Sequence, residues 1–210
     1  MVEHQLARRG IRDPGVLAAM REVPREAFLP PDLRPHAYDD GPLPIGEGQT
    51  ISQPYIVALM AEAASLSPSD RVLEVGAGSG YAVAVLSRIA GRVHAVERRP
   101  ALARAAAGRL RDLGHANVEL RAGDGTLGWP EAAPFDAILV AAGGPDVPRS
   151  LQDQLAPGGR LVIPIGPSGG PQTLVRVTRT GPDAFERQDL GGVRFVPLIG
   201  QEGWAEEGSP

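Results

Sequence analysis

Short apolar runs alternate with longer amphipathic segments from residue 71 onward, which is the pattern of strands separated by helices. The runs predict five strands, at residues 72–75, 92–96, 118–121, 135–141 and 160–165. Helices are expected from residue 81 to 89, from Pro100 to a stop at Gly114, and over residues 149–155. This alternation predicts the α/β class, with a doubly wound and mostly parallel sheet.

The alternation changes after Gly170. Residues 173–178 alternate polar and apolar side chains as a strand does, residues 180–183 are typical of a turn, and residues 193–198 form a last apolar run. No helix is predicted between these runs. The sheet is therefore expected to finish with antiparallel C-terminal strands.

The first 70 residues precede this sheet and are predicted to be helical in pieces. Asp13 can cap a helix over residues 14–21, a proline-rich stretch covers residues 24–44, and the apolar run at 55–60 indicates another helix. We therefore expect one domain with an N-terminal helical flank at 1–70, a sheet core at 71–200 and a tail at 201–210. Residues 202–210 of the tail are expected to be loose.

Three glycines at alternate positions, Gly76, Gly78 and Gly80, follow the first predicted strand. Glycine lets the backbone come close to a ligand, the next helix begins with free N–H groups, and Glu74 can meet a ligand cation. A dinucleotide fingerprint needs a small residue at position 81, where this chain has Tyr81. S-adenosylmethionine, which carries an ammonium and a sulfonium but no pyrophosphate, therefore fits better than NAD. A purely structural turn is the alternative.

Two more acids follow the next two predicted strands. Glu97 lies 21 residues after Gly76, where a carboxylate can accept both hydroxyls of a ribose. Asp124 lies between Gly123 and Gly125, where its carboxylate can accept a hydrogen bond from an adenine amino group. Because ligands bind beyond the carboxyl ends of parallel strands, these acids are expected at one rim of the sheet. The alternatives are a solvated strand-end charge and an ordinary turn.

Composition narrows the chemistry further. All 21 basic residues are arginine and cysteine is absent, which excludes lysine Schiff bases, P-loop lysines, thiol nucleophiles and cysteine-zinc sites. His4, His36, His94 and His115 are too far apart for a local ligand pair, so no metal is expected. A net charge of −4 argues against a nucleic-acid partner, and the lack of an 18-residue apolar run argues against a membrane span. We expect a cytoplasmic monomer.

A loop dense in hydroxyl and amide groups, residues 46–54, precedes the apolar run at 55–60. Residue chemistry alone gives Ser52 two interpretations. It can be the N-cap of the following helix, which Pro54 in the first turn supports, or it can contact a substrate.

Motifs along nearly the whole chain resemble those of the protein-L-isoaspartate O-methyltransferases, in that family's order. The matching residues are 38–46, 49–55, 72–81, 123–125, 133–138, 154–155, 158–164 and 193–198. The glycine motif is shared by many methyltransferases, whereas the Thr-Ile-Ser-Gln-Pro run at 50–54 is specific to this family and favours Ser52 as an active-site residue. Ile199 departs from the family, part of which has threonine there.

The resemblance implies a Rossmann-like fold and methyl transfer from S-adenosylmethionine to the free α-carboxylate of L-isoaspartyl residues in damaged proteins and peptides. Such methylation initiates repair through a succinimide. The cofactor contacts that the resemblance implies are Gln49, Thr50, Ile51, Ser52, Glu74, Gly76, Ala77, Gly78, Glu97, Arg98, Gly123, Asp124, Gly125 and Ala141. The implied acceptor contacts are the catalytic Ser52, Ala142 and the predicted strand from Val193 to Ile199.

Two alternatives stand beside this interpretation. One is a methyltransferase for another carboxylate, a small molecule or a nucleic acid, which would share the cofactor site but not the acceptor site. The other is a cofactor-binding protein without turnover, which would be expected to have lost the rim residues.

Overall fold

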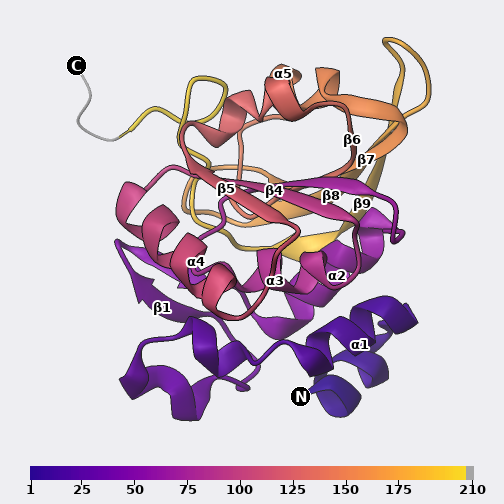
Figure 1. Cartoon of the computed structure of the whole chain (residues 1–210). Helices are drawn as coiled ribbons and strands as arrows, with labels where there is room; N and C mark the ends of the chain where they lie inside the picture. Colours follow the sequence, from indigo (N-terminus) through magenta and orange to yellow (C-terminus); the bar gives the residue numbers. More distant parts are fainter. Residues whose placement is uncertain (207–210) are drawn as a thin grey trace.

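A seven-stranded sheet crosses the molecule, with helices on both of its faces (Figure 1). The structure is a computed structural model that describes residues 1–206. The strands of this sheet are β3 (Arg71–Val75), β4 (Arg92–Glu97), β5 (Val118–Ala122), β6 (Phe135–Val140), β7 (Leu155–Ile165), β8 (Gln172–Arg179) and β9 (Phe185–Val193). Their order across the sheet is β5-β4-β3-β6-β7-β8-β9.

The central strand β3 pairs in parallel with a neighbour on each side, β4 and β6. From β3 the chain passes through α3 (Tyr81–Ser87) and α4 (Pro100–Asp112) to β4 and β5 on one side. It then returns to β6 and continues through α5 (Arg149–Asp153) to β7 on the other side. Helices α3 and α4 therefore cover one face and α5 the opposite face (Figure 1). Successive strands are added toward one edge of the sheet from β3 to β5 and toward the other edge from β6 onward, so the boundary between β3 and β6 is the topological switch point.

Alternate side chains of the central strands enter two separate cores. On β3, Val72 packs toward the helices α2 and α3, whereas Leu73 and Val75 pack on the other face. On β6, Leu139 belongs to the same core as Val72, and Ile138 belongs to the core on the other face. Strands buried on both faces read as continuous apolar runs, which is why the sequence pattern found the parallel part of the sheet.

The N-terminal flank packs beneath the face that carries α3 and α4 (Figure 1). It holds α1 (Pro14–Glu22), α2 (Pro54–Ala64) and a two-stranded antiparallel sheet of β1 (Leu43–Gly46) and β2 (Gln49–Ile51). Short helical turns complete the chain: η1 (Val2–Leu6), η2 (Ala7–Arg9), η3 (Arg25–Phe28), η4 (Pro31–His36), η5 (Gly125–Leu127) and η6 (Pro130–Ala132). Asp13 caps α1 as predicted, because its carboxylate accepts a hydrogen bond from the Val16 N–H at 2.9 Å. The small β1–β2 sheet was not predicted.

A buried arginine ties this flank to the sheet domain. The Arg25 guanidinium lies over the Tyr81 ring, 4.8 Å from its centroid, and its Nε donates to the Ala37 carbonyl oxygen at 2.7 Å. Phe28 meets the same ring edge-on, with centroids 5.6 Å apart. Tyr81 is the first residue of α3. The flank is therefore fixed against the helix that follows the glycine run.

The last strand differs from the prediction. The strand β9 is Phe185–Val193, whereas residues 193–198 were expected to form it. The turn at residues 180–183 returns the chain at once, with the Thr180 N–H donating to the Ala184 carbonyl oxygen at 2.8 Å. Strand β9 thus begins immediately after the turn. It lies at the exposed edge of the sheet, so most of its side chains are polar and carry no apolar signal.

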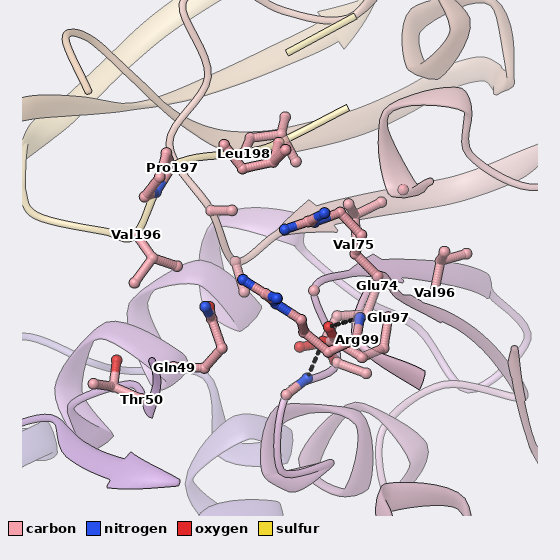
Figure 2. Close-up of a pocket in the computed structure, with 18 of the residues that line it drawn as sticks. Gln49, Thr50, Glu74, Val75, Val96, Glu97, Arg99, Val196, Pro197 and Leu198 are labelled. Atoms are coloured by element: carbon pink, nitrogen blue, oxygen red, sulfur yellow. Dashed lines mark hydrogen bonds between the residues drawn. The ribbon is translucent and has the colours of Figure 1, made fainter. Parts of the chain in front are cut away.

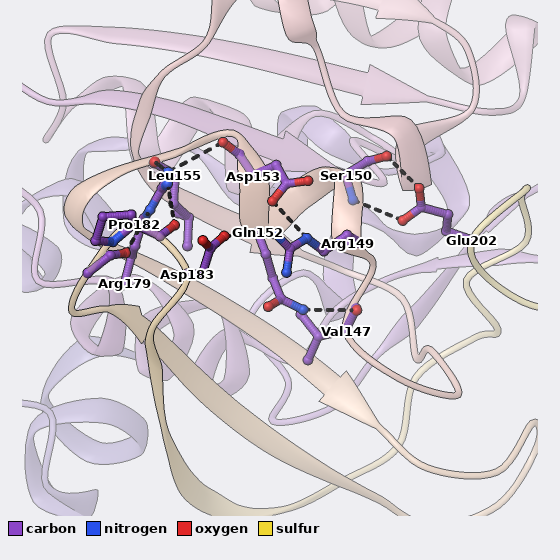
Figure 3. Close-up of polar contacts among 11 residues, drawn as sticks. Val147, Arg149, Ser150, Gln152, Asp153, Leu155, Arg179, Pro182, Asp183 and Glu202 are labelled. Carbon is purple, nitrogen blue, oxygen red and sulfur yellow. Dashed lines mark hydrogen bonds and ion pairs between the residues drawn. The ribbon is translucent and has the colours of Figure 1, made fainter.

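Helix α5 ends at Asp153 and β7 begins at Leu155, so the predicted helix over 149–155 was too long and the predicted strand from 160 too short. Arg179 fixes this junction, donating from one nitrogen to the Leu155 carbonyl oxygen at 2.6 Å and from another to the Pro182 carbonyl oxygen at 2.7 Å (Figure 3). The change from helix to strand is thus set by contacts with the distant β8 hairpin.

The tail is docked, so the expectation that it is loose is wrong for residues 202–206. The Glu202 carboxylate accepts from the Ser150 N–H at 2.9 Å (Figure 3), and the Trp204 N–H donates to the Leu198 carbonyl oxygen at 2.7 Å. Residues 207–210 lie outside the described part of the chain.

In the described part of the chain, no helix is both long and apolar enough to cross a bilayer.

Arg160 joins three segments at the start of the sheet. Its Nε donates to the Ala64 carbonyl oxygen at 2.7 Å, and a terminal nitrogen lies 3.3 Å from the Asp70 carboxylate. We predict that Arg160→Met lowers the free energy of unfolding by about 2–3 kcal/mol, because charge-assisted bonds to half-buried partners are lost. Urea denaturation measures this.

Arg149→Met is the control for Arg160→Met. Arg149 pairs with Asp153 at 2.8 Å, but this ion pair is exposed to solvent (Figure 3), and exposed pairs contribute little to stability. Equal losses in the two variants would contradict the prediction.

Candidate active site

A cavity of about 570 Å³ opens at the carboxyl ends of β3, β4 and β6. Its floor is formed by Val75, Val96 and Ala141, which end or follow these three strands. In Figure 2, Gln49 and Thr50 lie on one side, Glu74, Glu97 and Arg99 on the other, and residues 196–198 above. The cavity therefore occupies the switch point of the parallel sheet, where open α/β folds bind their ligands.

The glycine loop after β3 forms a wall of this cavity. The Gly76 N–H donates to the Val96 carbonyl oxygen at 2.8 Å, which ties the loop to β4. Gly76 and Gly78 have φ angles of 88° and 54°, a left-handed backbone that favours glycine. A Cβ on Gly78 would lie 3.3 Å from Ile45 Cδ1. The hairpin that carries Ile45 therefore packs directly against the loop.

Glu74 is a buried carboxylate that faces the cavity. Its side chain is 2% exposed, and within the described residues its Oε2 has no hydrogen-bond partner. Burial, and next to it the Glu97 carboxylate, raise the pKa of Glu74 well above its ordinary value of 4.5. Buried polar groups are normally paired, so this oxygen is suited to a cationic or hydrogen-bond-donating ligand.

Glu97 is also buried, but both of its oxygens are bonded. Oε2 accepts from the Gly78 N–H and Oε1 accepts from the Arg99 N–H, each at 2.8 Å. Figure 2 shows these two bonds. The carboxylate thus clamps the glycine loop to the start of α4, and each oxygen keeps a lone pair for a further donor.

Ser52 follows β2 and lies on the rim of the cavity. The N-cap of α2 is Gln53, and no side-chain hydrogen bond caps this helix. The interpretation of Ser52 as the N-cap is therefore wrong. Gln53 Nε2 donates to Asp40 Oδ1 at 2.7 Å, and Asp40 pairs with Arg9 at 2.9 Å. These contacts hold Gln53 to residues outside the cavity lining, while Ser52 lines the cavity.

Two segments complete the cavity, and the sequence analysis had placed only the first of them beside the acceptor. One is residues 196–199, and the other is the end of the C-terminal segment, residues 204–206. The Gly143 carbonyl oxygen joins them, because it accepts from the Leu198 N–H at 2.9 Å and from Trp204 Nε1 at 3.1 Å. Glu206 pairs with Arg98 at 3.0 Å. For residues 204–206, the sequence signal was a tryptophan in the tail that was expected to be loose.

Most of the predicted site residues meet at this cavity. Those that line it are Gln49, Thr50, Ile51, Ser52, Glu74, Gly76, Ala77, Gly78, Glu97, Arg98, Gly125, Ala141, Ala142 and Ile199. Gly123, Asp124 and Val193 are not among the lining residues. Sequence reasoning missed Arg99, Ser168 and Trp204, which do line it.

Asp124 anchors the C-terminal segment. Its Oδ1 accepts from the N–H and the hydroxyl of Thr126, at 2.9 and 2.7 Å, and its Oδ2 accepts from the Gln201 N–H at 2.7 Å. One acceptor position of Oδ2 remains for a ligand. The contact between Asp124 and an adenine stays a prediction.

Two of the histidines are packing residues remote from this chemistry. His94 packs against the Trp129 ring with centroids 5.1 Å apart, and His115 Nδ1 lies 2.7 Å from Ser87 Oγ. Burial lowers the pKa of both rings below 6.5. Within residues 1–206, no group of three or more histidine, aspartate and glutamate side chains is arranged to hold a metal ion.

A switch-point cavity lined by a glycine loop and strand-end carboxylates defines a Rossmann-like protein with a nucleotide-type ligand. The model of the protein-L-isoaspartate(D-aspartate) O-methyltransferase family matches residues 1–203, and the chain belongs to this family. It is 63% identical over 205 residues to protein-L-isoaspartate O-methyltransferase 1 of Rhodopseudomonas palustris strain HaA2, covering 98% of this chain and 84% of that protein. It is 64% identical over 206 residues to protein-L-isoaspartate O-methyltransferase of Methylorubrum extorquens strain PA1, covering 98% and 90%.

Solved structures agree with this assignment. One protein-L-isoaspartate O-methyltransferase superposes with a TM-score of 0.86 and 32% identity, over 97% of this chain and 67% of that one. A Plasmodium falciparum protein assigned the same activity, crystallised with S-adenosyl-L-homocysteine, gives a TM-score of 0.81 and 29% identity, over 94% and 96%.

The raised pKa of Glu74 makes stability depend on pH. The folded ligand-free protein holds this proton more tightly than the unfolded chain, so the associated stability is complete below pH 4.5 and is lost as the pH rises through the folded pKa. We predict that Glu74→Gln raises the Tm of the ligand-free protein at about pH 8, with the difference from wild type shrinking toward pH 4.5. Thermal scans across this range test it.

Glu47→Gln, on the exposed β1–β2 turn, is the control for Glu74→Gln and should show no such trend. A Tm difference between Glu74→Gln and wild type that does not change with pH would contradict the prediction.

Proposed function

We propose that this cavity binds S-adenosylmethionine and that the protein methylates the free α-carboxylate of L-isoaspartyl residues in proteins and peptides. The ester carbonyl can lose methanol far more readily than a carboxylate can lose an oxygen, so the next backbone nitrogen attacks it, a succinimide closes and repair of the damaged residue begins. The observation that carries the proposal is the buried Glu74 oxygen, which has no hydrogen-bond partner among residues 1–206, in a cavity of this family's fold. A cationic methyl donor would supply the positively charged partner that this oxygen lacks within the described residues.

The residues present fit such a donor. A cavity of about 570 Å³ is within the range of small-ligand sites. Glu74 would hold the cationic amino end, and Gly76 and Gly78 allow the backbone to approach the methionine part. Glu97 would accept from the ribose, and Gly125 would border the adenine together with Asp124.

When bound, S-adenosylmethionine would supply a methyl group already activated by its sulfonium, with S-adenosylhomocysteine as the leaving group. The acceptor carboxylate is ionised at neutral pH, so no general base is needed. The protein contributes position, and well-oriented reactants can gain about 7–11 kcal/mol. The Ser52 hydroxyl, on the cavity rim, would donate to the acceptor carboxylate and hold it in line.

The acceptor peptide would lie between the Ser52 loop and residues 196–199, with Ala142 beneath. The family acts on isoaspartyl-containing proteins. A monomeric state, a cytoplasmic location and the absence of nucleic-acid or membrane partners stay predictions.

A peptide pair that differs only in isoaspartyl or normal aspartyl linkage tests the substrate. We predict that labelled methyl passes to the isoaspartyl peptide with much the higher kcat/KM, because the normal carboxylate is displaced by about one bond length and loses its in-line geometry. Comparable methylation of both peptides would favour the alternative, a methyltransferase for other carboxylates or small acceptors.

Ser52→Ala tests the role of the hydroxyl. We predict a loss of about 5- to 150-fold in kcat/KM, which corresponds to about 1–3 kcal/mol of transition-state binding. The affinity for S-adenosylhomocysteine, measured by calorimetry, should hardly change. Ser69→Ala, in an exposed turn, serves as the control. Full activity of Ser52→Ala would remove Ser52 from the mechanism.

A further inference from the structure

The segment that borders the acceptor side of the cavity lies outside the seven strands of the sheet and meets its neighbours at isolated bridges, Pro197 with Gly143 and Ile199 with Trp204. Strand β9 ends at Val193, and residues 194–196 then leave the sheet. The backbone of Phe195 is instead bonded to the side chain of Gln172. The Phe195 N–H donates to Gln172 Oε1 at 2.8 Å, and Gln172 Nε2 donates to the Phe195 carbonyl oxygen at 3.2 Å.

The side-chain amide therefore replaces a strand neighbour. It satisfies one donor and one acceptor of the same residue, as a strand neighbour does for a hydrogen-bonded pair. Gln172 is 3% exposed, so water does not compete for these bonds. Its amide occupies space that only glycine leaves open, because a Cβ on Gly143 would lie 2.2 Å from Gln172 Nε2.

The residues that follow Phe195 are bonded to Gly143. Directly after this bracket, the Gly143 N–H donates to the Val196 carbonyl oxygen at 2.8 Å, and the Leu198 N–H donates to the Gly143 carbonyl oxygen at 2.9 Å. Residues 196–199 line the cavity opposite the Ser52 loop, whereas Gln172 itself does not reach the cavity. Gln172 thus acts on the cavity indirectly, through the backbone of this segment and through Gly143, beside which its amide lies.

We propose that Gln172 is a positioning residue for acceptor binding, which it serves by holding residues 195–199 against the cavity through the Phe195 backbone. This inference rests on the proposed function, because it assigns the acceptor peptide to the side of the cavity bordered by residues 196–199. Both hydrogen bonds of the Gln172 amide within residues 1–206 go to Phe195, and neither goes to the cofactor side, which is built from Glu74, Glu97 and the glycine loop.

Gln172→Leu tests the proposal and has a matched control in this chain. Gln154 is a second buried glutamine, 8% exposed, whose Oε1 accepts from the Trp129 N–H at 2.7 Å and whose Nε2 donates to the Leu127 carbonyl oxygen at 2.9 Å. It brackets backbone in the same manner but lies away from the cavity lining. Gln154→Leu should therefore reproduce the loss of stability without altering the acceptor site.

In Gln172→Leu we expect the KM for an isoaspartyl peptide to rise about tenfold, because two oriented hydrogen bonds to the segment are lost. The kcat at saturating peptide and the calorimetric affinity for S-adenosylhomocysteine should stay close to wild type. Gln154→Leu should lower the Tm while leaving this KM unchanged.

Gly143→Ala supplies a second variant that keeps the glutamine but displaces its amide, and it should raise KM in the same way. Equal KM values in Gln172→Leu and Gln154→Leu, or a cofactor affinity that falls as much as the peptide affinity, would overturn the proposal. If the wild-type protein does not methylate the isoaspartyl peptide at all, the proposed function is wrong, which is a different outcome from equal KM values in the two glutamine variants.

Discussion

The parallel pairing of β3 with both β4 and β6 is the constraint on which the site depends. Connections from β3 run over one face and connections from β6 over the other, so no connection covers the carboxyl ends between them. This geometry leaves an open cavity of about 570 Å³ at the carboxyl ends of these strands. Side chains at the strand ends, Glu74, Glu97 and Ala141 among them, necessarily face it.

Two buried carboxylates in this cavity have opposite tasks because their partners differ. Glu97 accepts from two backbone N–H groups and so fixes the glycine loop to α4. Glu74 lies beside it, and one of its oxygens has no hydrogen-bond partner in the described part of the chain; burial and the neighbouring Glu97 carboxylate raise the pKa of Glu74. One acid thus builds the site, and the other is left to meet a positively charged ligand.

The remaining walls come from irregular backbone fixed by side chains. Asp124 anchors the N–H of Gln201, Gln172 brackets Phe195, and Gly143 joins residues 196–198 to Trp204. Such bonds satisfy backbone groups as a strand would. They also let the chain bend around a ligand where a continuous strand would close the cavity.

The sequence by itself determined the parallel core, the glycine loop and the Asp13 cap, because local burial and turn chemistry leave periodic or position-specific signals. Most of the cavity residues were predicted from the resemblance of the sequence motifs to those of the family. Only the tertiary structure decided that β9 precedes residue 194, that Ser52 does not cap α2, and that Trp204 closes the cavity. An exposed edge strand has no apolar period. The conformation of a segment such as Phe195, which is held by the side chain of Gln172, depends on a residue far away in the sequence and leaves no local pattern.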